Sequence, residues 1–306
     1  MGSRLRFSVF ASIVVSMCAY SQSTDLLHVA LSGTAQTVQA ALDQGARVDQ
    51  RDATGETPLM VAAMANPNPG VVTALLAAGA DQNARDAYGK TAFILAAWHS
   101  QSPGVIAEFI RAGADVESSD SHGRTALMCA AEGNPKPEIV LALLKAGAKL
   151  EARDADMATP LLCAAAHNPN PEIAAVLLRA GAVATARDRS DRTALMCAAA
   201  ENPRGEMATA LIKGGAEVDE RSVLGKTALM CAAERSQNPA IIQVLVAAGA
   251  NVNAMDTAGK TALMWAAGSN GNPAIISALL RNGASTKARD KRTWFIVFLS
   301  PLSTEN

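Results

Sequence analysis

The sequence predicts an all-helical protein in which short repeated units stack into a solenoid. The string Thr-Ala-Leu-Met-Cys-Ala-Ala occurs at residues 125–131, 193–199 and 227–233, with close variants at 159–165 and 261–267. A polar residue opens a new unit every 34 positions, at Asp52, Asp86, Asp120, Asp154, Asp188, Ser222, Asp256 and Asp290. Internal periods of about 20–50 residues are typical of stacked arrays, because each unit buries its apolar face only against its neighbours.

The first half of each unit has the signals of a turn followed by a short helix. In the first complete unit, residues 52–55 form the turn, and Gly55 is free to take a positive φ. Thr57 is placed to cap the following helix, and Pro58 stands at the first helical position, where its missing N–H costs nothing. The alanine-rich residues 59–65 complete this helix.

The second half of the unit predicts another helix and its end. The Asn-Pro-Asn-Pro linker at residues 66–69 breaks the first helix, since proline disfavours helix at the residue before it. Valines and leucines between residues 71 and 76 then form the apolar stripe of a second helix. Gly79 is expected to end this helix in the left-handed conformation.

Two short helices and a turn at this period resemble the ankyrin repeat. The matching features are the Thr-Pro/Ala-Leu opening, the Ala-Ala pair, the Leu-Leu pair and the Gly-Ala-Asp-Gln-Asn close at residues 79–83, and together they cover residues 25–289. The resemblance implies an all-α solenoid with short β-turn or hairpin tips. Residues 27–30 also match the family's Leu-His-x-Ala, whereas later units replace that histidine with Met60 and its equivalents.

The period and the resemblance divide the chain into four parts. Residues 1–21 are expected to be a signal peptide, and residues 22–51 an N-terminal capping repeat. Residues 52–289 hold seven ankyrin repeats of 34 residues, and residues 290–306 form a degenerate C-terminal cap or tail. We number the units from one, the capping repeat, to eight, residues 256–289.

The N-terminus has the three-part layout of a secretory signal peptide. Arg4 and Arg6 precede an apolar run at residues 7–20, and small residues at Ala19 and Ser21 suit a cleavage site. A cytosolic tail, a short anchor and a lipoprotein modified at Cys18 are the alternatives; a bulky methionine near Cys18 disfavours the last. We therefore expect a periplasmic or secreted protein.

The C-terminal segment leaves the repeat pattern soon after Asp290. Residues 293–299 form an apolar run that begins with Thr293 and Trp294. One interpretation is an improvised cap that brings Trp294 near Trp265. The other is a truncated array whose apolar end binds a partner or self-associates, and the cap is favoured because an exposed apolar patch would threaten solubility.

The recurring cysteines are predicted to be core residues rather than a chemical motif. Cys129, Cys163, Cys197 and Cys231 occupy one position of successive units, which Val61, Leu95 and Trp265 fill elsewhere. Stacked helices lie about 8–10 Å apart, whereas a disulfide needs Cα atoms within about 7 Å. Zinc would need four converging ligands rather than a ladder.

Composition and motifs give no support to catalysis. The net charge of −1 shows no basic nucleic-acid footprint, and no glycine-rich phosphate loop or metal-spaced cluster is present, so we expect no cofactor, no metal and no nucleic acid. No apolar run past the N-terminus is long enough to span a membrane. The recurring Arg-Asp pairs, such as Arg51-Asp52, are interpreted as solvated or inter-repeat ion pairs.

The resemblance implies a partner-binding surface made of the turn tips and the residues that follow the Ala-Ala pair. At the tips the candidates are Tyr88, Lys90, His122, Arg124, Arg189, Arg192, Leu224, Lys226 and Lys260. After the Ala-Ala pair they are Trp98, His99, Glu132, His167, Glu201, Glu234 and Arg235. Tyr88 and Trp98 are the expected hot spot, since such residues dominate interface energies; the alternative is that Trp98 only packs over the adjacent helix.

These observations predict a monomeric, exported interaction module without enzymatic activity. It would bind an unidentified protein partner through a rigid concave face, with no small-molecule substrate. An envelope enzyme that it protects or inhibits is one form of this hypothesis. A secreted effector that binds another organism's proteins is the alternative, and an enzyme is a third class.

Overall fold

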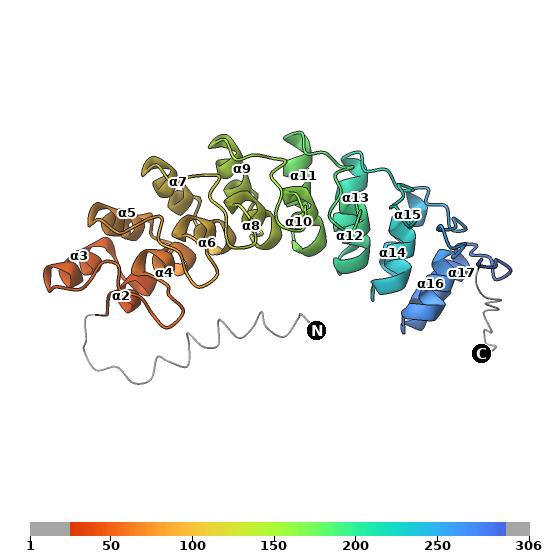
Figure 1. Cartoon of the computed structure of the whole chain (residues 1–306), viewed down its shortest axis with the longest axis horizontal. Coiled ribbons are helices and arrows are strands. Elements are labelled where there is room, and N and C mark those ends of the chain that lie inside the picture. Colours follow the sequence, from red (N-terminus) through yellow and green to blue (C-terminus); the bar gives the residue numbers. More distant parts are fainter. Residues whose placement is uncertain (1–24, 292–306) are drawn as a thin grey trace.

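The chain forms a single curved stack of helices. We describe it from a computed structural model, which places residues 25–291. The predicted signal peptide and residues 292–306 of the predicted tail, Trp294 included, lie outside the described residues. Within this range the chain forms sixteen helices, which follow one another along an arc (Figure 1).

The first helix of each unit lies on the concave side of the arc (Figure 1). We call these the inner helices. They are α2 (Leu26–Ser32), α4 (Pro58–Ala65), α6 (Ala92–His99), α8 (Ala126–Gly133), α10 (Pro160–His167), α12 (Ala194–Glu201), α14 (Ala228–Arg235) and α16 (Ala262–Ser269). Each packs against the inner helices of the neighbouring units.

The second helix of each unit forms an outer layer. These outer helices are α3 (Ala35–Asp43), α5 (Pro69–Ala77), α7 (Pro103–Arg111), α9 (Pro137–Lys145), α11 (Pro171–Arg179), α13 (Gly205–Lys213), α15 (Ala240–Ala247) and α17 (Pro273–Arg281). Leucines, valines, isoleucines and alanines of both layers merge into one continuous core that runs the length of the array. The predicted all-α solenoid is confirmed.

Local signals place the helix ends where the sequence predicts them. Thr57 caps α4, and its side chain accepts a hydrogen bond from the Met60 N–H at 3.4 Å. Pro58 and Pro69 are the first residues of α4 and α5. Gly79 follows α5 with φ +86°, so the predicted left-handed stop is confirmed.

The asparagine that ends most inner helices joins one unit to the unit before it. Asn168 is fully buried, and its Nδ2 donates to the carbonyls of Ala131 at 2.7 Å and Asn134 at 2.9 Å. Its Oδ1 accepts from the Asn170 N–H at 2.8 Å. The same bridge recurs at Asn66, Asn134, Asn202 and Asn270. The linker asparagine therefore joins neighbouring units by hydrogen bonds and also ends the first helix of its own unit.

The turn that opens each unit, which we call the tip, is organised by its first residue. In residues 86–90, Asp86 Oδ1 accepts from the N–H groups of Tyr88 and Lys90, both at 2.8 Å. Equivalent pairs of bonds form at Asp52, Asp120, Asp154, Asp188 and Asp256. These hydrogen bonds therefore fix the backbone at the third and fifth residues of the tip.

The arginine before a tip connects it to the next tip. Arg51 Nη1 donates to the carbonyls of Gly55 at 2.8 Å and Arg85 at 2.7 Å. Its partners are thus backbone oxygens, so the interpretation as an inter-repeat ion pair is wrong for Arg51. Arg187, in contrast, pairs with two acids of the next unit, Asp191 at 3.1 Å and Glu220. Backbone-directed bonds of this kind recur at Arg85, Arg153 and Arg221.

Two tips lack the usual glycine, and one of them changes the junction with its neighbour. Met157 and Asp191 each adopt φ +60°, a region in which non-glycine residues are strained. Elsewhere a tip carbonyl accepts the N–H of the following tip, as Tyr88 O does from Ser121 at 3.1 Å. Between units six and seven, the Val223 N–H instead donates to the Asp191 carboxylate.

Candidate functional site

The predicted binding residues share two structural positions. Those of the first group occupy the tips, and those of the second group occupy the last turn of an inner helix. Because the inner helices line the concave side (Figure 1), the second group borders that side at one end of each helix. The structure gathers most of these side chains into three clusters.

The first cluster surrounds Trp98, at the carboxyl end of α6. The Trp98 ring is half-buried and stacks on the His99 ring, with centroids 5.3 Å apart. Lys90 Nζ lies 4.1 Å from the centroid of the Trp98 ring, and the Arg124 guanidinium lies 5.1 Å from it. Tyr88 is 59% exposed beside Lys90.

Trp98 also packs over the next unit. The indole lies so close to the backbone of Gly133 in α8 that any Cβ at this position would overlap it. The packing interpretation of Trp98 is therefore correct for its ring, while Tyr88 keeps a large exposed surface. The two aromatic residues consequently differ in burial and contacts, although the sequence predicts one hot spot made of both.

The second cluster lies over unit five. A hollow of about 310 Å³ is lined by His122, Asp156 and His167, with Ala158 and Ala166 between them. Units four and six border it with ion pairs: Arg124 to Glu132 at 2.9 Å and Arg192 to Glu201 at 2.6 Å. The hollow exists because unit five carries alanines where the flanking units carry Arg124, Glu132 and Arg192.

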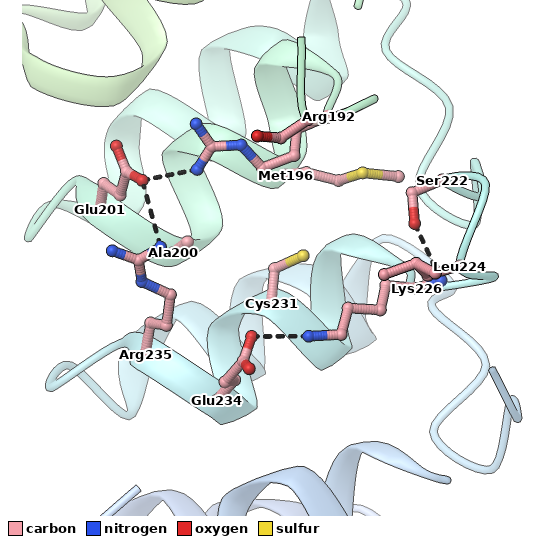
Figure 2. Close-up of a pocket in the computed structure, with 11 residues that line it drawn as sticks. Arg192, Met196, Ala200, Glu201, Ser222, Leu224, Lys226, Cys231, Glu234 and Arg235 are labelled. Atoms are coloured by element: carbon pink, nitrogen blue, oxygen red, sulfur yellow. Dashed lines mark hydrogen bonds and ion pairs between the residues drawn. The ribbon is translucent and has the colours of Figure 1, made fainter. Parts of the chain in front are cut away.

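The third cluster joins units six and seven and is drawn in Figure 2. Arg192 and Arg235 both face Glu201, with Arg235 Nη1 3.7 Å from its carboxylate. Lys226 Nζ pairs with Glu234 at 2.9 Å. These charges surround a hollow of about 330 Å³ to which Met196 and Cys231 contribute sulfur atoms (Figure 2).

An exposed apolar tip borders the third cluster. Leu224 lines the hollow and is 63% exposed, and its neighbour Val223 is 78% exposed. Exposed aliphatic side chains beside charged pairs are the combination found at the core and rim of protein interfaces. Leu224 thus lies beside the charged residues Arg192, Glu201, Lys226, Glu234 and Arg235 that line the same hollow.

Two predicted residues, Arg189 and Lys260, line neither hollow. Lys260 Nζ is 4.6 Å from the centroid of the Trp265 ring. Lys226 Nζ lies 3.5 Å from the same centroid. Arg189 is exposed and reaches Asp156 only at 4.0 Å. Sequence reasoning missed Trp265 as a surface residue, since it shares the position of the buried cysteines. Its half-exposed ring holds the Asp256 carboxylate through Nε1 at 3.0 Å.

The cysteine ladder is buried in the core, as predicted. Within the described range all four thiols are free, and none is more than 8% exposed. Burial raises the pKa of Cys129 and of Cys197 to about 12, and that of Cys231 to about 11. Burial likewise raises the pKa of Cys163 well above its usual value.

The thiols of residues 25–291 are expected to be unreactive in the folded protein. A raised pKa lowers the fraction of thiolate, and the exposure of 8% or less at each cysteine restricts access, so both requirements for alkylation are reduced. At about pH 8 we expect alkylation at least about a hundredfold slower than in urea-unfolded protein. Mass spectrometry after timed iodoacetamide treatment measures the rates, and fast labelling of Cys197 in native protein would contradict the core assignment.

Glu56 provides a pH-dependent element at the tip of unit two. Burial, followed by the nearby Asp52 and Asp86 carboxylates, raises the pKa of Glu56 from 4.5 to about 7. An acid whose folded pKa lies above its unfolded value binds its proton more tightly when folded. Its charge therefore costs stability progressively as the pH rises from about 4.5 through 7.

Replacing Glu56 with glutamine should remove this penalty. Glu56→Gln is expected to stabilise the protein by about 1–2 kcal/mol above pH 7, after discounting for partial exposure, and to leave it unchanged near pH 4. Thermal unfolding of both proteins across this range gives the comparison. A stability difference that did not vary with pH would show that Glu56 does not titrate in this way.

Between residues 25 and 291, the histidine, cysteine and acidic side chains form no group of three that could hold a metal ion. None of the helices in that range is long and apolar enough to cross a membrane.

Comparison with known proteins agrees with the helical architecture. A family model described as ankyrin repeats, in three copies, matches residues 26–120, 68–154, 134–222 and 195–290. Among solved structures, the chain is similar to the crystal structure of the human ASB11 ankyrin repeat domain, with a TM-score of 0.62 and 22% identity. That match covers 74% of this chain and 98% of the other. The search of curated proteins gave no significant match.

The structural match at this identity shows a shared fold alone, whereas the family model covers most of the chain. Ankyrin repeats are generic protein–protein interaction modules built on a binding scaffold rather than a catalytic one. The repeat period, the paired helices, the tips and the family match together place this chain in the ankyrin repeat family.

Proposed function

We propose that this protein is an exported, monomeric binding module that holds a protein partner against its concave face, without catalysing a reaction. The observation that carries the proposal is a contrast between positions of the repeat. From unit two to unit eight, the helix cap is always threonine, as at Thr57 and Thr261. The position after the Ala-Ala pair is filled in turn by Met64, Trp98, Glu132, Ala166, Ala200, Glu234 and Gly268.

This contrast separates the repeat positions that folding requires from those that are free to recognise a partner. A uniform scaffold needs a uniform core, and its inner surface could also be uniform if that surface had no specific task. The varied side chains instead create the Trp98 cluster, the unit-five hollow and the hollow between units six and seven. Rigid solenoids use such a surface to bind partners in a preformed geometry.

The cellular destination is a proposal that rests on the N-terminal sequence. Arg4, Arg6 and the apolar run before Ser21 support export to a periplasmic or extracellular location. An envelope enzyme that the module protects or inhibits is the partner class that fits this location. Fractionation of cells with an antibody to the repeats tests it, and recovery only in the cytosol would reject export.

Affinity capture with matched surface variants tests the binding face. The concave variant carries Tyr88→Ala, His167→Ala and Arg235→Ala, one exposed residue from each cluster. The control variant carries Lys145→Ala, Arg179→Ala and Lys213→Ala, on the exposed surface of three outer helices. We expect a protein from an envelope extract to bind the wild type and the control and to be lost, or weakened at least about tenfold, with the concave variant. Loss with the control alone would place binding on the outer face.

A further inference from the structure

The repeated architecture allows the charges of one unit to be compared with those of the next. The fifth tip residue is a cation in five units: Lys90, Arg124, Arg192, Lys226 and Lys260. In units four and seven, the residue after the Ala-Ala pair is a glutamate that neutralises this cation. Arg124 Nη1 lies 2.9 Å from Glu132, and Lys226 Nζ lies 2.9 Å from Glu234 (Figure 2).

Unit six achieves the same pairing with the following residue, Glu201. Arg192 Nη1 lies 2.6 Å from this carboxylate (Figure 2). The internal surface of the array therefore shows three times that a glutamate carboxylate can occupy the space beside the tip cation. Because the units share one backbone design, a carboxylate is the chemical group that we expect to pair with a tip cation.

Unit three has the cation without the acid. Trp98 stands where Glu132 and Glu234 stand in their units, and the ammonium group of Lys90 lies against its ring at 4.1 Å. Within residues 25–291, Lys90 makes no ion pair within 4.0 Å. The Asp86 and Asp120 carboxylates near it accept hydrogen bonds from backbone N–H groups and from Arg124, and the half-buried Glu56 of unit two interacts with it only through the longer-range attraction of their charges.

The surroundings of Lys90 favour an added negative charge. Burial lowers the pKa of Lys90 below its ordinary value, and the neighbouring Arg124 lowers it further, against the opposite effect of Cys129, Asp86 and Asp120. A carboxylate beside the ammonium group would offset the desolvation and the repulsion together. The exposed Tyr88 ring, whose centroid is 5.6 Å from Lys90 Nζ, supplies an apolar and hydrogen-bonding wall for the residue that carries it.

We propose that Lys90 is the receptor for an aspartate or glutamate side chain of the protein partner, seated beside Trp98 and against Tyr88. The partner carboxylate pairs with the Lys90 ammonium group as Glu132 and Glu234 pair with the cations of their own units, while Trp98 fills the position that those glutamates occupy. This inference rests on the proposed function, since it names a feature of the partner that the concave face selects. The aromatic walls favour an amino-acid side chain over a hydrated inorganic anion.

Lys260 provides a matched comparison on the same array. It occupies the same repeat position, contacts a tryptophan ring and has no ion pair within 4.0 Å in the described part of the chain. Its third tip residue is Ala258 rather than a tyrosine, and Trp265 engages the Asp256 carboxylate through its indole N–H. If acidic peptides were attracted only by positive charge, they would bind at both lysines. If the surroundings of Lys90 recognise the carboxylate, they bind at Lys90 alone.

Subtractive selection from a displayed library of random peptides tests the proposal without knowledge of the partner. The library is first depleted on immobilised Lys90→Met protein and then selected on the wild type. Methionine keeps an unbranched apolar stem over the Trp98 ring, so the variant should fold normally, which circular dichroism checks. The same procedure with Lys260→Met runs in parallel, and the recovered peptides are synthesised for affinity measurement.

We expect the peptides recovered with the Lys90 pair to be enriched in aspartate or glutamate. Their affinity should fall about tenfold with Lys90→Met, fall similarly when the acid becomes its amide, and stay unchanged with Lys260→Met. No discriminating peptide, no enrichment in acids, or equal loss with both lysine variants would overturn the receptor. If the peptide selection failed, the affinity capture described above could still support binding by the concave face, since it compares the concave variant with the control variant. The two proposals can therefore fail separately.

Discussion

Replacing Asn168 with alanine is expected to lower the free energy of unfolding by about 2–4 kcal/mol, since the change leaves two buried carbonyls and one half-buried N–H without their partner. The Asn168 side chain is 0% exposed and is the shared partner of the carbonyls of Ala131 and Asn134 and of the Asn170 N–H. In a linear array a weakened junction also reduces cooperativity. Urea unfolding followed by circular dichroism should therefore show an earlier and broader transition.

Ser236 supplies the control for this prediction. It ends α14 at the equivalent position, but its hydroxyl bonds only to the backbone of Asn238, two residues away. Ser236→Ala should consequently cost no more than about 1 kcal/mol, the loss of a local hydrogen bond. Equal destabilisation by the two substitutions would show that the asparagine bridges add nothing between units.

Replacing Gly133 with alanine is expected to destabilise the protein by about 1–2 kcal/mol, although alanine is the better helix former by about 1 kcal/mol. The new methyl group would overlap the Trp98 indole and drive it away from α8. This movement would also separate the ring from Lys90 and Arg124. Thermal unfolding reports the cost, and fluorine NMR of fluorotryptophan-labelled protein should show the Trp98 signal displaced.

Two comparisons isolate the overlap from the helix propensity. Gly268 lies in the last turn of α16 with open space where a Cβ would be, so Gly268→Ala should stabilise by about 0.5–1 kcal/mol. In a Trp98→Ala background, Gly133→Ala should likewise become neutral or stabilising. If Gly133→Ala remained destabilising without the indole, its cost would come from the backbone and not from Trp98.

The sequence predicts the repeat frame and the helix ends because these depend on local chemistry. Thr57, Pro58 and Gly79 act within a few residues of their own positions, and the period repeats each signal often enough to remove ambiguity. The burial of the cysteines follows in the same way from their exchange with Val61 and Leu95 between units.

Interactions between units could not be predicted from single units. The side-chain hydrogen bonds of Asn168 and Arg51 reach residues about one period away. Within a single unit, the same two residues look like a helix breaker and a member of an ion pair. Trp98 requires the distance to Gly133, which the sequence does not contain. The hollow over unit five depends on what its neighbours carry, so Ala158 and Ala166 gave no signal as site residues.

The central claim is that the concave face holds a protein partner, and site-specific photo-crosslinking in living cells tests it most directly. A photoreactive amino acid is placed singly at His99, His167 or Arg235 on the inner helices and at Lys145, Arg179 or Lys213 on the outer helices. All six positions are exposed, so their reactivity is comparable. We expect one protein to be crosslinked from the inner positions and not from the outer ones. Crosslinking from the outer positions alone, or equally from both faces, would contradict the proposal.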